Sequence, residues 1–374
     1  MTTTSQGYTI QSILTDNNNW EAYKVNHSVD PYVAKEVDKM LLCCHPSKGF
    51  YRGICPHCEK EVIMHMRCNS KVCSRCGRSY VDRWVEKAKK KLFKEQHRLV
   101  TLTLPADLRG VLEGRWDLLK IVQDSAHETL QIVASRTFRK KKVKIALLVG
   151  LQTYGQDMKF HPHLHCMMSE KVKYENGYND LNYIPKEILR RVWRDVIVEN
   201  LSTADINDKE KSIVYSMLQQ YPNGFVTDVG RRSMNRREVV GYLARYMRHP
   251  AMANSRILFH GKRRVTIRMK DKLKREYSLW FPIDDFISRL LIHVAPKHFR
   301  VVRWYGLYSR GEVRLERKEN ERREIISAFI RDRRRVFRCP YCNNLLDEVV
   351  FVAYKPPGNE RSGDKINYEL RMAS

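Results

Sequence analysis

Residues 145–168 read IALLVGLQTYGQDMKFHPHLHCMM, and this stretch decides the fold. Apolar residues dominate 144–153, as in a buried strand, and 161–168 are expected to return as a second strand. Between them, Gly155-Gln156-Asp157 is typical of a turn. We therefore expect a β-hairpin that belongs to an antiparallel sheet.

Three histidines alternate along the second strand, in His161-Pro-His163-Leu-His165. Residues two apart in a strand share a face, so His163 and His165 can present their imidazoles to one cation while Leu164 points into the core. The competing interpretation is a row of histidines on a solvent-exposed face. A cation needs a third ligand, and Gln152 lies about opposite His163 in a hairpin that turns near Asp157. Alternatives for this ligand are Gln156, Asp157, His161 and Glu238.

Two tyrosines follow on a predicted helix over 235–248, which begins with Asn235 as a cap and ends before Pro250. Tyr242 and Tyr246 are four residues apart and therefore share one helical face. A phenol with a pKa near 10 attacks phosphorus well only beside a cation and positive charge, because phenolate must be favoured. Candidate sources of that charge, and of DNA contacts, are Arg245, Arg248 and Arg256.

The same tyrosine spacing occurs at Tyr174 and Tyr178, within the loop-like sequence Tyr-Glu-Asn-Gly-Tyr. Spacing alone therefore does not identify a nucleophile in a chain with 19 tyrosines. The catalytic hypothesis for Tyr242 and Tyr246 depends on a basic helix that lies next to the histidine strand.

Outward from the hairpin, the chain mixes separate strands and helices, which predicts an α+β fold with an antiparallel sheet. The further strands are expected at 99–104, 224–230, 256–259, 264–269 and 277–281. The helices are expected at 31–42, 84–98, 116–135, 185–199, 209–220 and 312–334.

Cysteine spacing predicts a zinc site near the N-terminus. Cys55-Pro-His-Cys58 and Cys73-Ser-Arg-Cys76 are separated by 14 residues, as in a four-thiolate site. Cys68 is the first alternative ligand, followed by Cys43, Cys44, His57 and His65. The zinc is expected to be structural and to present basic residues such as Arg75 to DNA. Cys339-Pro-Tyr-Cys342 supplies two thiolates, which need two further ligands or a second chain, or bind no metal.

Charge identifies the class of partner. The chain of 374 residues has 69 Lys and Arg against 42 Asp and Glu, a net charge of +27. The excess gathers in runs, which favours a polyanion such as DNA over a membrane. No apolar run reaches the roughly 18 residues of a membrane span, and no signal pattern is present, so we expect a cytoplasmic protein. The basic runs are 139–144, 231–237, 262–275 and 331–338.

Four segments are expected: a polar helical lead-in at 1–42, a zinc-binding domain at 43–80, a nuclease domain at 81–310, and a basic helix with a CxxC tail at 311–374.

Taken in order, the motifs resemble those of the two-tyrosine HUH transposases of rolling-circle insertion sequences, over about residues 55–308. The resemblance is carried by the cysteine-rich segment and by Val100-Thr-Leu-Thr-Leu-Pro105, Gln152-Thr-Tyr-Gly, His161-Pro-His-Leu-His165, Tyr242-Leu-Ala-Arg-Tyr246, Pro250-Ala-Met-Ala-Asn-Ser-Arg-Ile257, His293-Val-Ala-Pro-Lys-His-Phe-Arg300 and Arg303-Trp-Tyr-Gly306.

The resemblance implies an HUH nuclease core, with a central antiparallel sheet flanked by helices and a small N-terminal zinc-binding domain. It implies that His163 and His165 bind Mg²⁺ or Mn²⁺, and that Tyr242 and Tyr246 form 5′-phosphotyrosine links in turn. The partner would be single-stranded DNA at the element ends and at the target, and no nucleotide cofactor is required. The alternatives are a plasmid or phage rolling-circle replication initiator and a non-catalytic zinc-dependent DNA-binding regulator. Arg248 stands nearest to the place where replication initiators often carry a Lys.

Overall fold

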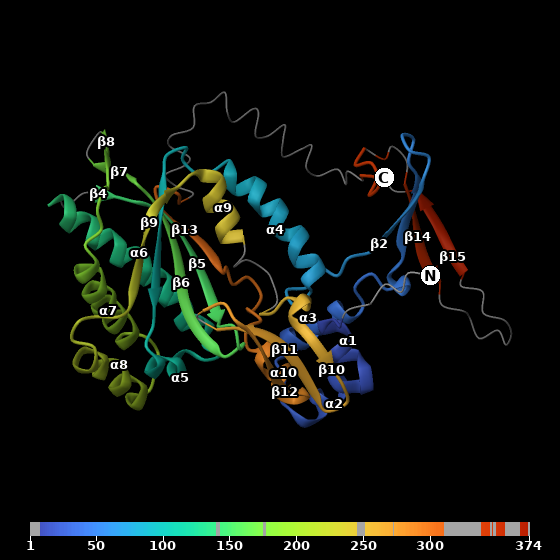
Figure 1. Ribbon diagram of the computed structural model, residues 1–374, viewed down its shortest axis with the longest axis horizontal. Helices are drawn as coiled ribbons and strands as arrows, with labels where there is room; N and C mark the ends of the chain where they lie inside the picture. Colours follow the sequence, from blue (N-terminus) through green and yellow to red (C-terminus); the bar gives the residue numbers. More distant parts are fainter. Residues whose placement is uncertain are drawn as a thin grey trace.

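A computed structural model describes residues 8–139, 143–174, 177–244, 251–271, 273–309, 338–344, 346, 349–355 and 367–372. Its architecture is α+β, with a central antiparallel sheet and a separate cysteine-rich region, as the sequence predicts (Figure 1). The expected helix at 312–334 lies outside the described residues.

The central sheet has five strands in the order β13-β5-β6-β3-β9, and every neighbouring pair is antiparallel. The strand that carries the three histidines, β6, is therefore the middle strand. Its position explains the apolar character of the sequence around the histidines, because both faces of a middle strand are covered. The strands are β13 (Val302–Gly306), β5 (Ala146–Tyr154), β6 (Phe160–Ser169), β3 (His97–Thr103) and β9 (Thr227–Met234).

Helices cover the two faces of this sheet in different ways (Figure 1). On one face, Leu102, Val149 and Leu164 pack with α6 (Trp116–Phe138) and α7 (Lys186–Ser202) in a large apolar core, to which α8 (Asp208–Gln220) adds Val214. On the other face, Leu148 and Met167 pack with Val81 of α4 (Ser74–Lys89) and Val240 of α9 (Arg236–Ala244). The sheet is thus the middle of three layers, and α9 lies over the face that carries the odd-numbered residues of β6.

A second lobe joins the N-terminal helices to a late part of the segment expected at 81–310. The N-terminal helices share one apolar core with strands and a helix from 257–291, through residues such as Trp20, Val37, Ile267 and Phe286. The described part of the expected lead-in, from residue 8 to residue 42, thus buries its apolar faces against a segment that was expected to belong to the nuclease domain. The elements are α1 (Ile10–Thr15), α2 (Asn19–Asn26), α3 (Pro31–Leu41), β10 (Ile257–His260), β11 (Arg264–Lys270), β12 (Glu276–Pro282) and α10 (Ile283–Leu291).

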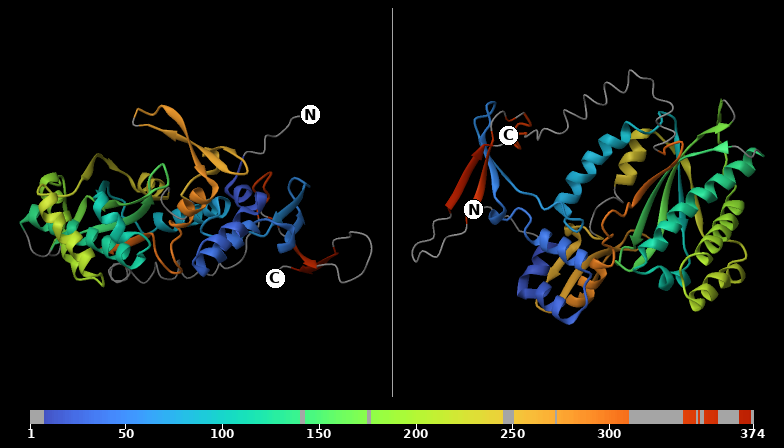
Figure 2. Two further views of the ribbon diagram at one scale, coloured as in Figure 1. Left: turned by 90° about the horizontal axis from the view of Figure 1, so that it is seen from below. Right: turned by 180° about the vertical axis from the view of Figure 1, so that it is seen from behind.

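The cysteine-rich module is a four-stranded antiparallel sheet in the order β15-β14-β1-β2, which lies apart from the central sheet in both views of Figure 2. It combines β1 (Phe50–Ile54) and β2 (Glu61–His65) with β14 (Val350–Lys355) and β15 (Asn367–Met372). Sequence reasoning did not anticipate these two C-terminal strands. The expected boundary at residue 80 also falls within α4, which continues without a break to Lys89.

Short elements complete the described chain. They are α5 (Arg109–Leu112), β4 (Val143–Lys144), β7 (Lys171–Tyr174), β8 (Gly177–Asp180) and the 3-10 turns Asp16–Asn18, Pro46–Lys48, Ala106–Leu108 and Asn254–Arg256. Among the described residues, no helix is both long enough and apolar enough to cross a membrane.

Candidate active site

The β5–β6 hairpin has the register that the sequence predicts. Gln152 pairs with His163, Gly150 pairs with His165, and the chain turns between Tyr154 and Phe160. Leu164 is fully buried in the core on the opposite face. The alternation of β6 therefore places His163, His165 and Gln152 together on the face that α9 covers.

The two histidines are held as neutral imidazoles. The Nδ1–H of His163 donates to the carbonyl oxygen of His161 at 2.8 Å, which leaves Nε2 with its lone pair. The Nε2 atom of His165 lies 3.3 Å from Oε1 of Gln152. Burial lowers the pKa of both imidazoles, and that of His165 falls to about 3. Neutral imidazole is the form that binds a metal.

Two alternatives for the third ligand are engaged elsewhere. Oε1 of Gln156 accepts from the backbone N–H of Lys270 at 3.2 Å, so this amide is directed toward β11. Oδ1 of Asp157 accepts from the backbone N–H of Lys159 at 3.2 Å, within the hairpin turn. Both side chains stabilise the turn that connects the two strands.

Glu238 and His161 are the other two alternatives for the third ligand. Oε2 of Glu238 accepts from the backbone N–H of Asn235 at 2.9 Å, and Asn235 returns the bond, so the pair forms the capping box of α9. His161 lies on the ligand face, with its ring centroid 5.3 Å from that of His163. Of the five candidates, Gln152 is the one for which the structure gives a hydrogen bond to His165.

Helix α9 brings Tyr242 to the histidines. Val239 and Val240 are fully buried and fix the helix on the sheet. The Oη atom of Tyr242 lies 3.2 Å from Nδ1 of His165, and the two rings meet edge to face with centroids 5.6 Å apart. His165 thus contacts Gln152 through one nitrogen and Tyr242 through the other. The predicted Tyr246, Arg245 and Arg248 lie outside the described residues.

The second tyrosine pair is in a different setting. Tyr174 ends β7 and Tyr178 belongs to β8, and these strands form a hairpin in which Tyr174 pairs with Gly177. The pair therefore does not share a helical face. Its strands belong to a separate three-stranded sheet with β4.

The two remaining arginine candidates have local partners. Arg75 is exposed in the first turn of α4, and a hydrogen bond with the thiol of Cys44 raises its pKa. The guanidinium of Arg256 donates to the carbonyl oxygens of Gln156 and Arg268, which ties the second lobe to the hairpin turn. Burial lowers the pKa of Arg256.

The four predicted zinc ligands do not meet at one site. Cys73 and Cys76 lie with Cys43 and Cys68, whereas Cys55 and Cys58 lie with Cys339 and Cys342. The physical reason is the β1–β2 hairpin, because its turn carries Cys55 and Cys58 away from the start of α4. The predicted set of four thus needs correction, and its first alternative, Cys68, belongs to the group that includes Cys73.

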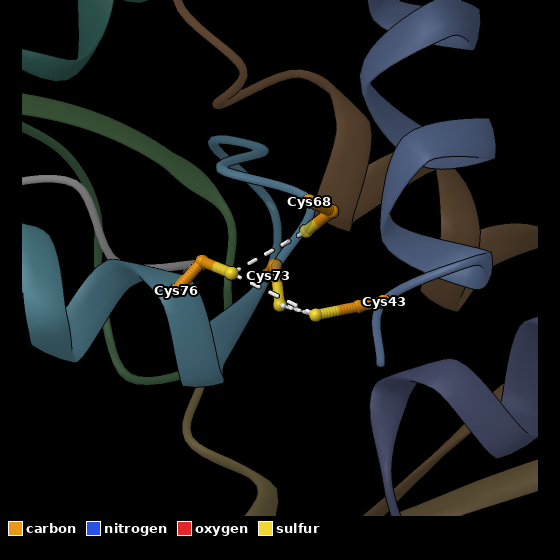
Figure 3. Close-up of side chains that lie close together, drawn as sticks. All are labelled: Cys43, Cys68, Cys73 and Cys76. Atoms are coloured by element: carbon orange, nitrogen blue, oxygen red, sulfur yellow. Dashed lines mark hydrogen bonds between the residues drawn. The ribbon is translucent and has the colours of Figure 1, made fainter. Parts of the chain in front are cut away.

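The first cluster has the dimensions of a zinc site (Figure 3). Cys43 lies 3.6 Å from both Cys73 and Cys76, and Cys68 lies 3.6 Å from Cys76. Four thiolates about 2.3 Å from one zinc ion are about 3.8 Å apart in a tetrahedron. A hydrogen bond from Cys68 lowers the pKa of Cys73 to about 5, so a thiolate forms readily. This geometry supports structural Zn²⁺.

A groove at the edge of the central sheet was missed by the sequence analysis. It has a volume of about 760 Å³ and combines aromatic rings with basic side chains. The signal available in the sequence was Arg303-Trp-Tyr, which was noted only as part of the resemblance. The aromatic residues are Tyr80, Trp84, Trp116, Tyr154, Phe299, Trp304, Tyr305 and Tyr308, and the basic ones are Lys71, Lys91, Arg300 and Arg303.

Comparison with known proteins identifies the chain. Residues 15–104 match a family model described as "Transposase zinc-binding domain", defined on IS91, and residues 147–316 match one described as "Putative transposase". The chain belongs to the IS91 family of transposases. The family is of the rolling-circle type, and the chain is thus a DNA-binding, DNA-cutting enzyme.

Two curated relatives agree with this assignment. The transposase is 24% identical over 335 residues to "Putative transposase y4qJ" of Sinorhizobium fredii, with 83% of this chain and 82% of the relative covered. It is also 24% identical over 315 residues to the transposase for insertion sequence element IS801 of Pseudomonas savastanoi pv. phaseolicola, with 79% and 75% covered. No solved structure gives a significant match.

Proposed function

We propose that this transposase cuts and rejoins single-stranded DNA through 5′-phosphotyrosine intermediates, with Tyr242 and Tyr246 as the nucleophiles. The observation that carries the proposal is the contact of 3.2 Å between Oη of Tyr242 and Nδ1 of His165. It joins a potential nucleophile to a potential metal ligand on one face of the sheet. A phenol that only packed in a core would not need this position.

His163, His165 and Gln152 would hold Mg²⁺ or Mn²⁺. The amide oxygen of Gln152 is a donor type that suits Mg²⁺ and Mn²⁺. The two imidazoles are neutral lone-pair donors, and the resemblance to HUH transposases assigns them to this cation. None of the three carries a formal charge when both imidazoles are neutral. A bound cation would therefore keep its positive charge for the polarisation of the scissile phosphate.

The residues of the chain would carry out a transesterification. The phenol oxygen of Tyr242 forms a bond to phosphorus, the bond from phosphorus to the 3′ oxygen breaks, and the phenol proton is lost while the 3′ oxygen gains one. The products are a 5′-phosphotyrosyl ester and a 3′-hydroxyl. A 3′-hydroxyl of another strand then reverses the step. One ester replaces another each time, which is why no nucleotide cofactor is needed.

His165 would position the nucleophile. Its buried imidazole is neutral and bonds to Tyr242 at one nitrogen while the other nitrogen faces Gln152. The capping box of Asn235 and Glu238 and the buried Val239 and Val240 fix α9, so the phenol is held in place before DNA binds. Such preorganisation favours catalysis because little reorientation remains.

The groove supports single-stranded DNA as the substrate. Lys91 Nζ lies 5.5 Å from the ring centroid of Trp304, and the rings of Trp84 and Trp304 are 6.4 Å apart. Aromatic faces beside basic side chains are the usual means of binding unpaired bases and their phosphates. The net charge of +27 provides the matching long-range attraction.

A covalent-adduct assay tests the proposal. The purified protein is incubated with a labelled single-stranded element terminus and Mg²⁺ or Mn²⁺, and the denatured mixture is examined for labelled protein. We expect an adduct with the wild type that is lost on chelation and in the double variant Tyr242→Phe/Tyr246→Phe. The matched control is Tyr174→Phe/Tyr178→Phe, which changes an equally spaced pair and should retain the adduct. Adduct formation by the Tyr242→Phe/Tyr246→Phe variant at the wild-type level would overturn the proposal.

A further inference from the structure

The second cysteine cluster unites residues from opposite ends of the chain. Sγ of Cys55 lies 3.6 Å from that of Cys342, and Sγ of Cys58 lies 3.6 Å from that of Cys339, although the partners are 287 and 281 residues apart in sequence. All four sulfur atoms lie within 4.8 Å of one another. These spacings approach the edge of about 3.8 Å expected for four thiolates around one zinc ion.

The cluster is built from two turns of the same design. Each has the sequence Cys-Pro-X-Cys, as Cys55-Pro-His-Cys58 and Cys339-Pro-Tyr-Cys342. In each, the residue after the second cysteine donates its backbone N–H to the carbonyl oxygen of the first, from Glu59 at 2.8 Å and from Asn343 at 2.9 Å.

The backbone of the two turns also agrees in detail. Glu59 and Asn343 both adopt left-handed conformations, with φ of 56° and 61°. The first cysteine of each turn donates its N–H two residues beyond the second, from Cys55 to Lys60 at 3.0 Å and from Cys339 to Asn344 at 2.8 Å. A left-handed conformation costs energy outside glycine, so its repetition indicates that both turns serve one purpose, the presentation of two sulfur atoms.

Besides its strand pairing, the described part of this module has only a small apolar cluster. The buried residues of that cluster are Cys55, Cys339, Val62 and Leu346, in contrast to the large cores elsewhere in the molecule. Such a small cluster does not compensate for the entropy of ordering strands from both chain ends. A metal that binds only the assembled cysteines would supply the missing free energy.

We propose that a second Zn²⁺ binds Cys55, Cys58, Cys339 and Cys342 and fastens the C-terminal strands to the N-terminal hairpin. The strand pairing fits this role, because β14 pairs with β1 from Phe50 opposite Val352 to Arg52 opposite Val350. The ion would close a loop that contains the whole nuclease domain. The transposase then carries two structural zinc ions, one for each cysteine cluster.

Zinc counting on the full-length protein tests the proposal. Elemental analysis and native mass spectrometry of the wild type should give two zinc ions per chain. The variant Cys339→Ser/Cys342→Ser should retain one. Cys166→Ser, which changes a fully buried cysteine of β6 outside both clusters, should retain two. A wild type with one zinc ion, a double variant with two, or iron in place of the second zinc would overturn the proposal.

Hydrogen exchange shows which strands lose protection when the second zinc is lost, and it distinguishes local opening of the module from unfolding of the whole chain. In Cys339→Ser/Cys342→Ser, amides of β1 and β14 should lose protection while those of β5 and β6 keep it. The single variant Cys342→His, which preserves a metal-binding side chain, should restore the second zinc and the protection of β1. Unchanged protection of β1 and β14 in the double variant would contradict a fastening role, whatever the fate of the nuclease domain.

Discussion

The histidine face of the β5–β6 hairpin and the cysteine module at the chain ends are built in opposite ways. His165 on the middle strand β6 and Gln152 on the neighbouring strand β5 are 13 residues apart, and both strands lie between two apolar cores. The second cysteine cluster joins residues more than 280 apart around a very small core. From this difference we expect the hairpin scaffold to form without a metal and the module to depend on one. Substitutions at the hairpin should lower the rate of strand cutting and leave the fold intact. Substitutions at the module should destabilise its fold and leave the cutting chemistry intact.

The largest expected effect is from His163→Ala. Loss of one of the proposed metal ligands should lower the rate of strand cutting by at least ~100-fold, since ligand losses exceed the 10- to 100-fold typical of supporting residues. The melting temperature should remain close to that of the wild type, because His163 is not part of either apolar core. Single-turnover cutting of a labelled strand and thermal unfolding measure the two quantities. If His163→Ala cut DNA at the wild-type rate, His163 would not hold the cation that cutting requires.

Gln152→Ala should have a smaller effect of the same kind, a decrease in cutting of roughly 10- to 100-fold, because water can replace one neutral amide oxygen while both histidines remain. The lost amide oxygen should also raise the Mg²⁺ or Mn²⁺ concentration needed for half-maximal cutting. Gln156→Ala is the matched control, because its amide bonds to Lys270 on β11 and not to a histidine. Equal effects of the two substitutions would exclude a specific role for Gln152.

Trp304→Ala tests whether the groove at the edge of the central sheet binds single-stranded DNA. Loss of a stacking surface should weaken single-stranded DNA binding by about 1 to 3 kcal/mol. The cutting rate at saturating DNA should change much less, because Trp304 is neither a proposed metal ligand nor a proposed nucleophile. Trp280→Ala on β12, an exposed tryptophan outside the groove, is the control. Fluorescence anisotropy with a labelled oligonucleotide measures the affinity, and equal affinities of wild type and Trp304→Ala would exclude the groove.

The smallest expected effect on cutting follows from Cys68→Ser. This variant should lose the zinc ion of the first cluster and melt at a lower temperature, but the second lobe retains its apolar core from Trp20 to Phe286. Cutting at saturating DNA and well below the melting temperature should therefore be preserved. A complete loss of cutting by protein that circular dichroism shows to be folded would mean that the histidine face depends on the first cysteine cluster, and it would contradict this prediction.

The sequence predicted the local parts of this molecule well. The alternation of 161–168 and the turn at Gly155 specify the hairpin, and its register follows from the turn, so Gln152 was expected opposite His163 before its contact with His165 was seen. Most helices were also predicted within a few residues, as for α6 and α8. These features depend on neighbours in sequence, which periodicity and capping report directly.

The long-range parts could not be predicted in the same way. The spacing of Cys55, Cys58, Cys73 and Cys76 suggested one site, because spacing does not reveal that a hairpin separates the pairs. The pairing of β14 with β1 and the burial of the N-terminal helices against 257–291 join distant segments, and no local pattern specifies such partners. The aromatic residues of the groove come from several elements and share a surface only after folding.

The most direct test of the central claim is to identify the residue that becomes linked to DNA. After reaction with a single-stranded terminus, the adduct is digested with protease and nuclease, and the nucleotide-bearing peptide is sequenced by mass spectrometry. We predict a phosphodiester link from a 5′ phosphate to Tyr242 or Tyr246. A link to any other residue, such as Tyr174 or Tyr178, or a 3′-phosphate link, would contradict the proposed arrangement of histidine strand and tyrosine helix.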